Sequence, residues 1–166
     1  MFRPMRRFKQ ALSPEECQAV LERGTSGVLA LSGDGGWPYA VPLSYVYADG
    51  KLYFHSAKSG HKVDAIRSCP RASFCVIDQD HIVPEEYTTY FRSVIAFGTA
   101  RELEDPWEKR QALEALAAKY SPEQEAGRKE EIRAQFANVA MVELTVEHMT
   151  GKEAIELVRQ KNSSTL

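Results

Sequence analysis

Hydrogen-bond donors are concentrated in one short segment, residues 53–62, which reads YFHSAKSGHK. The residue types predict a strand end, a glycine-bearing turn and a helix start. Backbone N–H groups at a helix start attract anions, and the helix dipole adds to the attraction. The segment therefore predicts a phosphate site, formed around Gly60 with the candidate donors His55, Ser56, His61 and Lys62. The alternative is a polar loop before a capped helix, because the GxxxxGK[ST] pattern of a Walker loop is absent.

A proline-bearing strand is the second candidate, through its residues Val41, Pro42, Leu43 and Ser44. A strand that proline bends exposes backbone N–H and C=O groups without ladder partners, and the edge of a flat heteroaromatic ring can satisfy them. The residues alone favour the simpler interpretation, an edge strand that proline protects from aggregation.

Two cationic residues, Arg92 and Lys152, are the remaining candidate site residues. Arg92, followed by Ser93, enters an apolar strand, which is costly for an arginine unless it pairs with a phosphate, a carboxylate or another subunit. A solvent-facing arginine at a strand start is an equal alternative. Lys152 follows a predicted glycine turn at Thr150-Gly151, which by itself is weak evidence for a site.

Other chemistries lack support in the pattern. The four histidines have no spacing that places two on one helix face, so we expect no metal site. The three cysteines, Cys17, Cys69 and Cys75, lack CxxC spacing, and buried structural thiols are expected over a Cys–His nucleophile. GDGG at 33–36 lacks the GxGxxG pattern and the βαβ frame of a nicotinamide site, so such a donor would have to dock transiently.

The first half of the chain predicts an antiparallel meander. A helix starts at Ser13-Pro14-Glu15-Glu16 with a capping box, and Gly24 ends it in a left-handed conformation. Glycine turns at 33–36 and 49–50 then connect three strands, predicted over Val28–Leu31, Trp37–Tyr47 and Lys51–His55. Because Pro38 and Pro42 lie in the middle strand, it must be an edge strand or bent.

The second half predicts longer strands separated by helices. A short helix capped by Ser59 covers 59–68, and strands cover 72–77, 88–103 and 138–146, with a loop at 78–87. The Asp105-Pro106 pair starts a helix that carries an apolar stripe. A charged helix is predicted over 123–135, and a weak helix is predicted after Gly151. Tightly connected strands favour a closed antiparallel barrel over a parallel sheet.

Bulk composition fits one intracellular domain. The 166 residues include 43% hydrophobic and 27% charged residues, with a formal charge of −2. We expect a single domain over 1–166 with an irregular arm at 1–12 and a frayed tail from about 159 to 166. No apolar run suits a membrane helix or a secretory signal, and the acidic balance argues against nucleic acid as a partner, so a cytoplasmic location is expected.

Several motifs in one order carry a family resemblance. The segments are an MRR arm, GVLAL, PYAVPLSYVY, DGKLYFHSAKSGHKVDAI, SFCVI, TTYFRSVIAFGTA and EHMTGKEAI, from about Met5 to Ile155. Together they closely resemble the nitroimidazole-resistance family, which belongs to the pyridoxamine 5′-phosphate oxidase-like, flavin mononucleotide (FMN)-binding split-barrel proteins.

This resemblance implies a mainly β, α+β antiparallel split barrel that forms a homodimer with FMN at the subunit interface. It implies that His61 and Lys62 hold the phosphate, that the PLS segment lies along the flavin ring and that Lys152 approaches the cofactor. His55 is the candidate catalytic residue beside the flavin, able to protonate a nitro oxygen during reduction. The expected activity is an FMN-dependent reductase of nitroaromatic or related electrophilic compounds.

Two alternatives remain open at this point. One is a flavin-binding carrier or sensor without turnover, and the other is a relative that binds haem or a deazaflavin on the same barrel. The apolar strand YFRSVIAFG is a separate indication of dimerisation, since a partner subunit could cover one of its faces. Burial of the strand within one chain explains its apolar sequence equally well.

Overall fold

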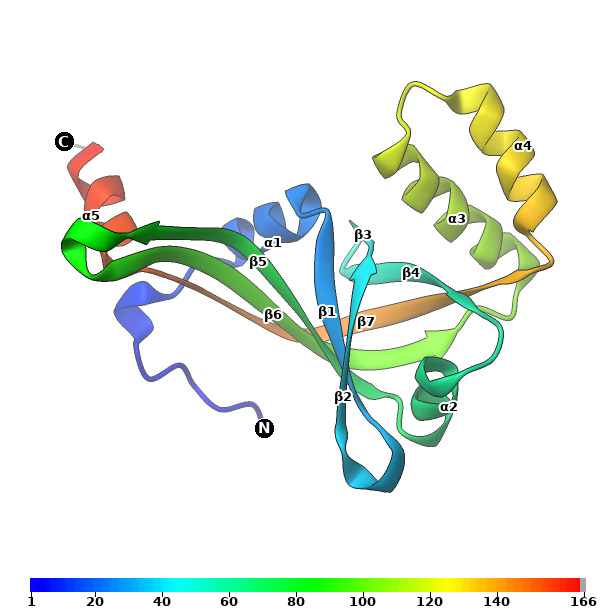
Figure 1. The fold of residues 1–166 in the computed structure, drawn as a ribbon, viewed down its shortest axis with the longest axis horizontal. Helices are drawn as coiled ribbons and strands as arrows, with labels where there is room; N and C mark the ends of the chain where they lie inside the picture. Colours follow the sequence, from blue (N-terminus) through cyan, green and yellow to red (C-terminus); the bar gives the residue numbers. More distant parts are fainter. Residues whose placement is uncertain (165–166) are drawn as a thin grey trace.

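A computed structural model describes residues 1–164 as one seven-stranded antiparallel sheet with helices around it (Figure 1). The order of strands across the sheet is β2-β1-β5-β6-β7-β4-β3. The strands are β1 (Ser26–Ser32), β2 (Pro38–Ser44), β3 (Val46–Ala48), β4 (Lys51–Ala57), β5 (Arg71–Val83), β6 (Thr88–Glu102) and β7 (Val139–Glu153). The mainly β, antiparallel α+β barrel expected from the sequence is therefore confirmed.

Five α-helices accompany the sheet. They are α1 (Pro14–Arg23), α2 (His61–Ser68), α3 (Pro106–Tyr120), α4 (Glu125–Gln135) and α5 (Ile155–Ser164). None of these helices is long and apolar enough to cross a membrane, within the described residues. Three short 3₁₀ turns cover Phe8–Gln10, Asp34–Gly36 and Pro84–Glu86.

The start of α1 follows the sequence prediction. The Ser13 hydroxyl accepts from the Glu16 backbone N–H at 3.2 Å, and the Glu16 carboxylate accepts from the Ser13 N–H at 2.8 Å, which completes the capping box. The predicted helix end is wrong in its geometry, because Gly24 is extended (φ −63°, ψ 139°). Gly24 is required for space instead, since a Cβ there would lie 2.5 Å from the Tyr45 hydroxyl oxygen.

The predicted meander is also wrong, because the strand expected over 37–47 is divided at Tyr45. Its first part, β2, pairs with β1, and its second part, β3, pairs with β4, so the two parts lie at opposite ends of the strand order. Consecutive residues thus bring the two edges of the sheet together and close the barrel. The proline-bearing strand is both at an edge and interrupted, as its prolines require.

A single hydroxyl satisfies the backbone at this division. The Tyr120 hydroxyl, at the end of α3, accepts from the Tyr45 N–H at 2.9 Å and lies 2.9 Å from the Tyr45 carbonyl and 2.5 Å from the Thr25 carbonyl. Tyr45 is completely buried and packs edge-on against Phe74, with ring centroids 4.9 Å apart. Helix α3 is therefore fixed to the closure of the barrel.

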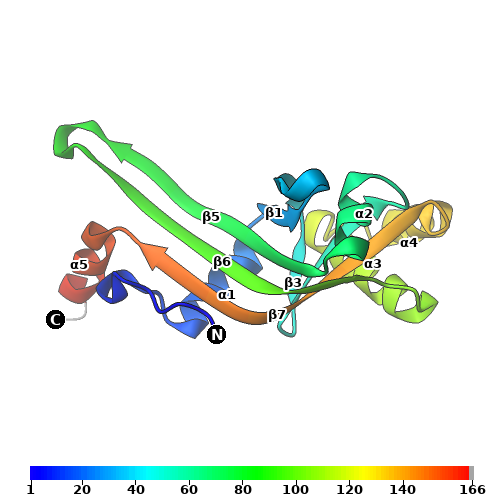
Figure 2. The ribbon, with the colours of Figure 1, turned by 90° about the horizontal axis from the view of Figure 1, so that it is seen from below.

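The strands β5 and β6 form a long hairpin that projects beyond the body of the molecule (Figure 2). Much of the loop expected over 78–87 is part of β5, with a bulge between Ile77 and Gln79, and the hairpin turns only at the 3₁₀ turn before Tyr87. Similarly, β7 is longer than the strand predicted over 138–146. The glycine turn predicted at 150–152 is wrong, since Gly151 pairs with Val94 inside the β6–β7 ladder.

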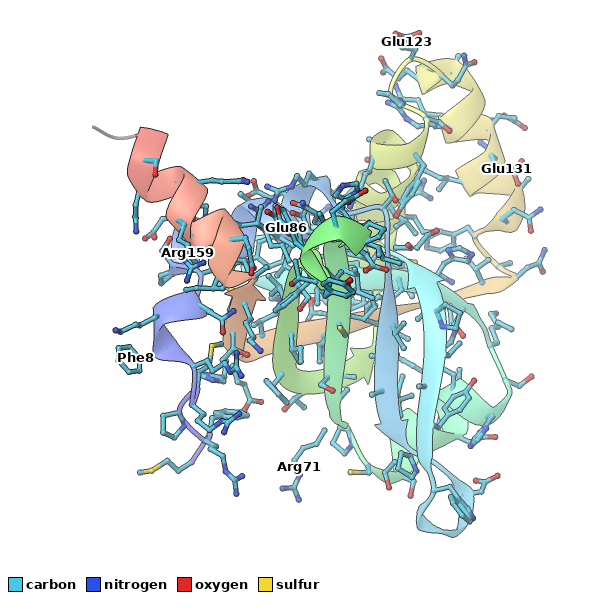
Figure 3. The ribbon with its side chains drawn as sticks, turned by 60° about the vertical axis from the view of Figure 1, so that its left-hand side comes forward. Phe8, Arg71, Glu86, Glu123, Glu131 and Arg159 are labelled. Atoms are coloured by element: carbon cyan, nitrogen blue, oxygen red, sulfur yellow. The ribbon has the colours of Figure 1, made fainter. Side chains whose placement is uncertain are left out.

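The two ends of the molecule carry different helices. At one end, α2, α3 and α4 surround the start of β7, whereas α5 and the N-terminal arm pack near its end (Figure 2). Figure 3 labels Glu131 on α4 at the first end and Arg159 on α5 with Phe8 at the second. Part of the tail expected from about residue 159 belongs to α5, which extends to Ser164, and residues 165–166 lie outside the described residues.

Candidate functional site

The bend between β4 and α2 is the centre of the predicted phosphate site. Gly60 has φ 122° and ψ 173°, a conformation almost exclusive to glycine, and nothing lies within 4 Å of a Cβ built there. The predicted cap is wrong, because the N-cap of α2 is Gly60 and not Ser59, and no side chain accepts from the first turn. The first N–H groups of α2 are thus left without a side-chain acceptor, which is the arrangement that binds anions.

Lys62 lies in the first turn of this helix and is half-buried. Burial alone lowers the pKa of its ammonium group below the ordinary lysine value. Among residues 1–164, no carboxylate forms an ion pair with Lys62. A partly desolvated cation without an anion is therefore placed beside the uncapped N–H groups.

The structure gives His61 a partner that the sequence reasoning missed. Its ring stacks on Tyr39 of β2, with ring centroids 4.0 Å apart and planes at 22°. Its Nε2 lies 3.4 Å from the backbone N of Asp34 and 3.8 Å from an oxygen of the Asp34 carboxylate. These contacts join the start of α2 to the β1–β2 turn and orient the ring.

The strands β2 and β4 place the other candidates on alternating faces. Val41 and Leu43 pack against the core, whereas Pro42 and Ser44 are exposed on the outer face. On β4, Ser56 is buried and His55 is exposed. The outer face therefore offers Pro42, Ser44 and His55 to a ligand, and Val41 and Leu43 contribute only backbone groups.

A cavity of about 390 Å³ lies beside this outer face, under the hairpin of α3 and α4. Its walls join the strand residues Ser44, His55 and Val139 to helix residues that are mainly apolar. The contacts that hold α3 over the sheet come from a small cluster of Leu103, Ala112, Leu116 and Met141. Ser44 and His55 thus belong both to the predicted flavin site and to the wall of this cavity.

Arg92, Ser93 and Lys152 lie at the other end of the sheet. Ser93 pairs with Lys152 in the β6–β7 ladder, while His55 pairs with Met141, eleven residues earlier on β7. At the usual rise per residue this is roughly 35 Å along the strand. Within one chain the candidates therefore fall into two groups, one on β2, β4 and α2 and one on β6 and β7 near Lys152.

In the second group, Arg92 pairs with carboxylates. The Arg92 guanidinium donates to Glu153 at 3.0 Å and to Asp78 at 3.2 Å, so in this chain it makes the carboxylate pairing that was one of the expected alternatives. Asp78 also accepts from Arg23 of α1 at 2.6 Å, and hydrogen bonds from Arg23 and then Arg92 lower its pKa. The Lys152 ammonium lies over the Phe91 ring, 5.2 Å from its centroid.

The three cysteines lie in different parts of the fold, in α1, after α2 and in β5. All three are free thiols; Cys17 is buried, and Cys69 and Cys75 are half-buried. Burial raises the pKa of Cys17 to about 11, which disfavours the reactive thiolate. Within the described residues, no group of three or more metal-ligating side chains is close enough to hold a metal ion.

Comparison with known protein families gives one match over most of the chain. Residues 13–153 match the family model described as pyridoxamine 5′-phosphate oxidase. A search of curated proteins finds no match.

Solved structures give further matches. An FAD-binding protein from Mesorhizobium loti is 31% identical, with a TM-score of 0.65 over 87% of this chain and 97% of that one. A candidate 5-nitroimidazole antibiotic resistance protein from Bacteroides thetaiotaomicron VPI-5482 is 21% identical, with a TM-score of 0.71 over 86% of each chain. An FAD and haem binding protein from Mycobacterium smegmatis is 24% identical, with a TM-score of 0.72 over 88% of this chain and 73% of that one.

Proposed function

Because the chain belongs to the pyridoxamine 5′-phosphate oxidase family, we propose that it binds FMN and reduces small nitroaromatic or related electrophilic compounds. The observation that carries this proposal is Lys62, a partly desolvated cation without an ion-pair partner in residues 1–164, at the uncapped start of α2. A phosphate dianion would compensate both the buried charge and the free N–H groups.

The residues around this bend fit the rest of an FMN molecule. Open space next to Gly60 lets a phosphate approach the backbone closely. From there the exposed face of Pro42 and Ser44 leads to His55, which gives a flat ring a wall with donors at its edge. The similarity to an FAD-binding protein supports a flavin in general, and the phosphate-sized bend leads us to propose FMN.

A bound flavin would supply electrons singly or in pairs to an acceptor beside it. Reducing a nitro group to a nitroso group consumes two electrons and two protons and releases water, and continuation to the amine consumes four more of each. We propose reduced nicotinamide as the class of donor. His55 is positioned at the cavity wall to donate one of the protons to a nitro oxygen, while Ser44 orients that oxygen.

The two groups of candidates lead us to propose a homodimer. Within one chain, the partner of His55 on β7 lies eleven residues before Lys152, roughly 35 Å along the strand, which is farther than one small cofactor reaches. In a two-fold dimer the contacts are reciprocal, so an arrangement that joins one end of a chain to the opposite end of its partner forms two equal sites. Such a pairing would bring Lys152 of one chain to the flavin held by Lys62 of the other.

The absorption spectrum of the purified protein tests the cofactor proposal, followed by chromatography of the extracted cofactor. FMN is expected, at one per chain. Extracted FAD, a haem band or a colourless protein that does not bind added FMN would each overturn it. Reduction of a nitroaromatic by NADH or NADPH without oxygen then tests turnover, and flavin binding without reduction would favour the carrier or sensor alternative.

A further inference from the structure

The cavity under α3 and α4 is a candidate ligand site next to the proposed flavin face. Its walls on the helix side are Leu113, Leu116 and Ala117 of α3 and Ile132 of α4, and Val139 closes the strand side. Leu116 and Ile132 are nearly fully buried, so packing fixes this apolar part of the lining. A volume of about 390 Å³ is at the small end of the range for ligand pockets, suited to one or two rings.

The polar groups of the cavity are unevenly distributed. Ser44 and His55 line the wall next to the candidate flavin face, and Glu131 and Gln135 of α4 line the wall on the other side. The Tyr120 hydroxyl also reaches the lining, but it is engaged with the backbone of Tyr45 and Thr25 and serves the fold. Hydrogen-bonding groups for a ligand are therefore available at two opposite positions.

The Glu131 carboxylate in the cavity lining favours neutral ligands over anionic ones. Glu131 is exposed, and in the described part of the chain it forms no ion pair, whereas its neighbour Glu130 pairs with Arg133 at 3.0 Å. Among the described residues that line the cavity, none is a lysine or an arginine. An anionic ligand would therefore meet an apolar lining and an unpaired carboxylate, which both disfavour it.

We propose that this cavity binds the electron-accepting substrate, and that α4 selects flat, neutral molecules of one or two rings while disfavouring anions. This inference rests on the proposed function, because Ser44 and His55 are what connect the cavity to the flavin face. The acceptor group of the substrate lies against these two residues, and its ring lies between Leu113, Leu116 and Ile132. The Glu131 carboxylate sets the charge preference.

Two ligands of equal shape test the preference directly. The neutral 4-nitrobenzamide and the anionic 4-nitrobenzoate are titrated into the oxidised protein while methyl NMR follows Leu113, Leu116 and Ile132. We expect shifts of these methyl signals with the amide and weaker binding of the benzoate. Glu131→Gln should improve the relative affinity for the benzoate by about threefold to tenfold, the effect of one nearby exposed charge. Glu130→Gln, one residue away and outside the cavity, should leave the ratio unchanged.

A second pair of variants tests the place of binding. Ala117→Phe fills the cavity and should weaken 4-nitrobenzamide binding about tenfold or more with FMN affinity unchanged, whereas Ala118→Phe, which does not line this cavity, should have no effect. If Ala117→Phe does not fold, the methyl shifts and the Glu131 pair still decide the question.

Three results would overturn the inference: unshifted methyl signals, an unchanged ratio in Glu131→Gln, or loss of FMN binding in Ala117→Phe, which would place the cofactor itself in the cavity. Because binding is measured without turnover and with or without FMN present, these results are separate from a failure of the proposed function.

Discussion

At the scale of single residues, the burial of Lys62 predicts that anion binding depends on pH. Its pKa is lowered by burial, so in the unliganded protein the protonated form carries a penalty that an anion removes. Binding of a phosphate group is therefore coupled to protonation of Lys62. FMN affinity should fall as the pH rises through the lowered pKa of the free protein, at a lower pH than an ordinary lysine would titrate.

The measurement is FMN fluorescence quenching as a function of pH, above the range in which the phosphate itself titrates. Lys62→Met should weaken FMN binding about tenfold to a hundredfold, the usual contribution of a charge-assisted hydrogen bond, and remove the alkaline decline. Riboflavin, which lacks the phosphate, should bind both proteins equally. An FMN affinity in Lys62→Met that equals the wild-type value at all pH values would exclude Lys62 from the phosphate site.

His55 leads to a different prediction, because we propose that it faces the substrate. His55→Ala should retain FMN and lower the rate of nitro reduction about a hundredfold, the lower range for loss of a general acid. The control is His81→Ala on the exposed β5–β6 hairpin, which should change neither property. Anaerobic stopped-flow measurement of flavin reoxidation by a nitroaromatic checks both variants, and an unchanged rate in His55→Ala would remove its proposed role.

At the scale of elements, one glycine at the N-cap of α2 and one within α4 predict opposite changes in stability. Neither would bring an added Cβ within 4 Å of another atom, so backbone conformation decides the outcome. Gly60→Ala is strained at φ 122° and should lower the free energy of unfolding by about 1–3 kcal/mol. Gly127→Ala, inside α4, should raise it by about 0.5–1 kcal/mol.

Urea denaturation of both variants measures these differences, and FMN titration shows whether the bend matters for binding. Gly60→Ala should also weaken FMN binding, because the bend sets the direction of the first N–H groups of α2. Equal stability changes in the two variants would contradict the assigned backbone of the bend.

Local signals in the sequence explain which elements are predictable. The capping box at Ser13 and the Asp105 cap, which accepts from Trp107 and Glu108 N–H groups at 2.9 Å, are satisfied within four residues, so both helix starts are confirmed. The division of the second strand at Tyr45 depends on Tyr120, 75 residues later, and no local pattern contains it. The true length of β5 was hidden for a similar reason, since its polar end is stabilised by pairing with β6.

The features of the candidate site likewise divide into those that local sequence predicts and those that depend on distant segments. The glycine bend and Lys62 are adjacent in sequence and could be predicted together. The stack of His61 on Tyr39 and the cavity that His55 shares with α3 depend on packing between distant segments. The apolar stripe of Ala112, Leu113, Leu116 and Ala117 indicates that α3 packs on something, but its period alone does not identify Ser44 and His55 as neighbours.

At the scale of the whole molecule, the separation of His55 and Lys152 along β7 allows a test by mixing chains. If each FMN site takes Lys62 from one chain and Lys152 from the other, Lys62→Ala and Lys152→Ala homodimers each lose one contact in both sites. A heterodimer of the two variants has one site that lacks both contacts and one site that is intact. Co-expression with two affinity tags, followed by sequential purification, isolates that heterodimer.

The heterodimer should bind half as much FMN as the wild-type dimer, with wild-type affinity, because one of its two sites retains both lysines. If Lys62 and Lys152 instead served sites within their own chains, every site in the heterodimer would lack one contact, and wild-type affinity would not return. Carrying both substitutions on one chain and none on the other gives the matched control. In that heterodimer, if the sites are shared between chains, each of the two sites lacks one lysine, so no high-affinity site should remain. If each chain instead forms its own site, the unsubstituted chain keeps a high-affinity site. The two arrangements therefore predict opposite results for the same pair of substitutions, which separates a shared site from a merely stabilising dimer.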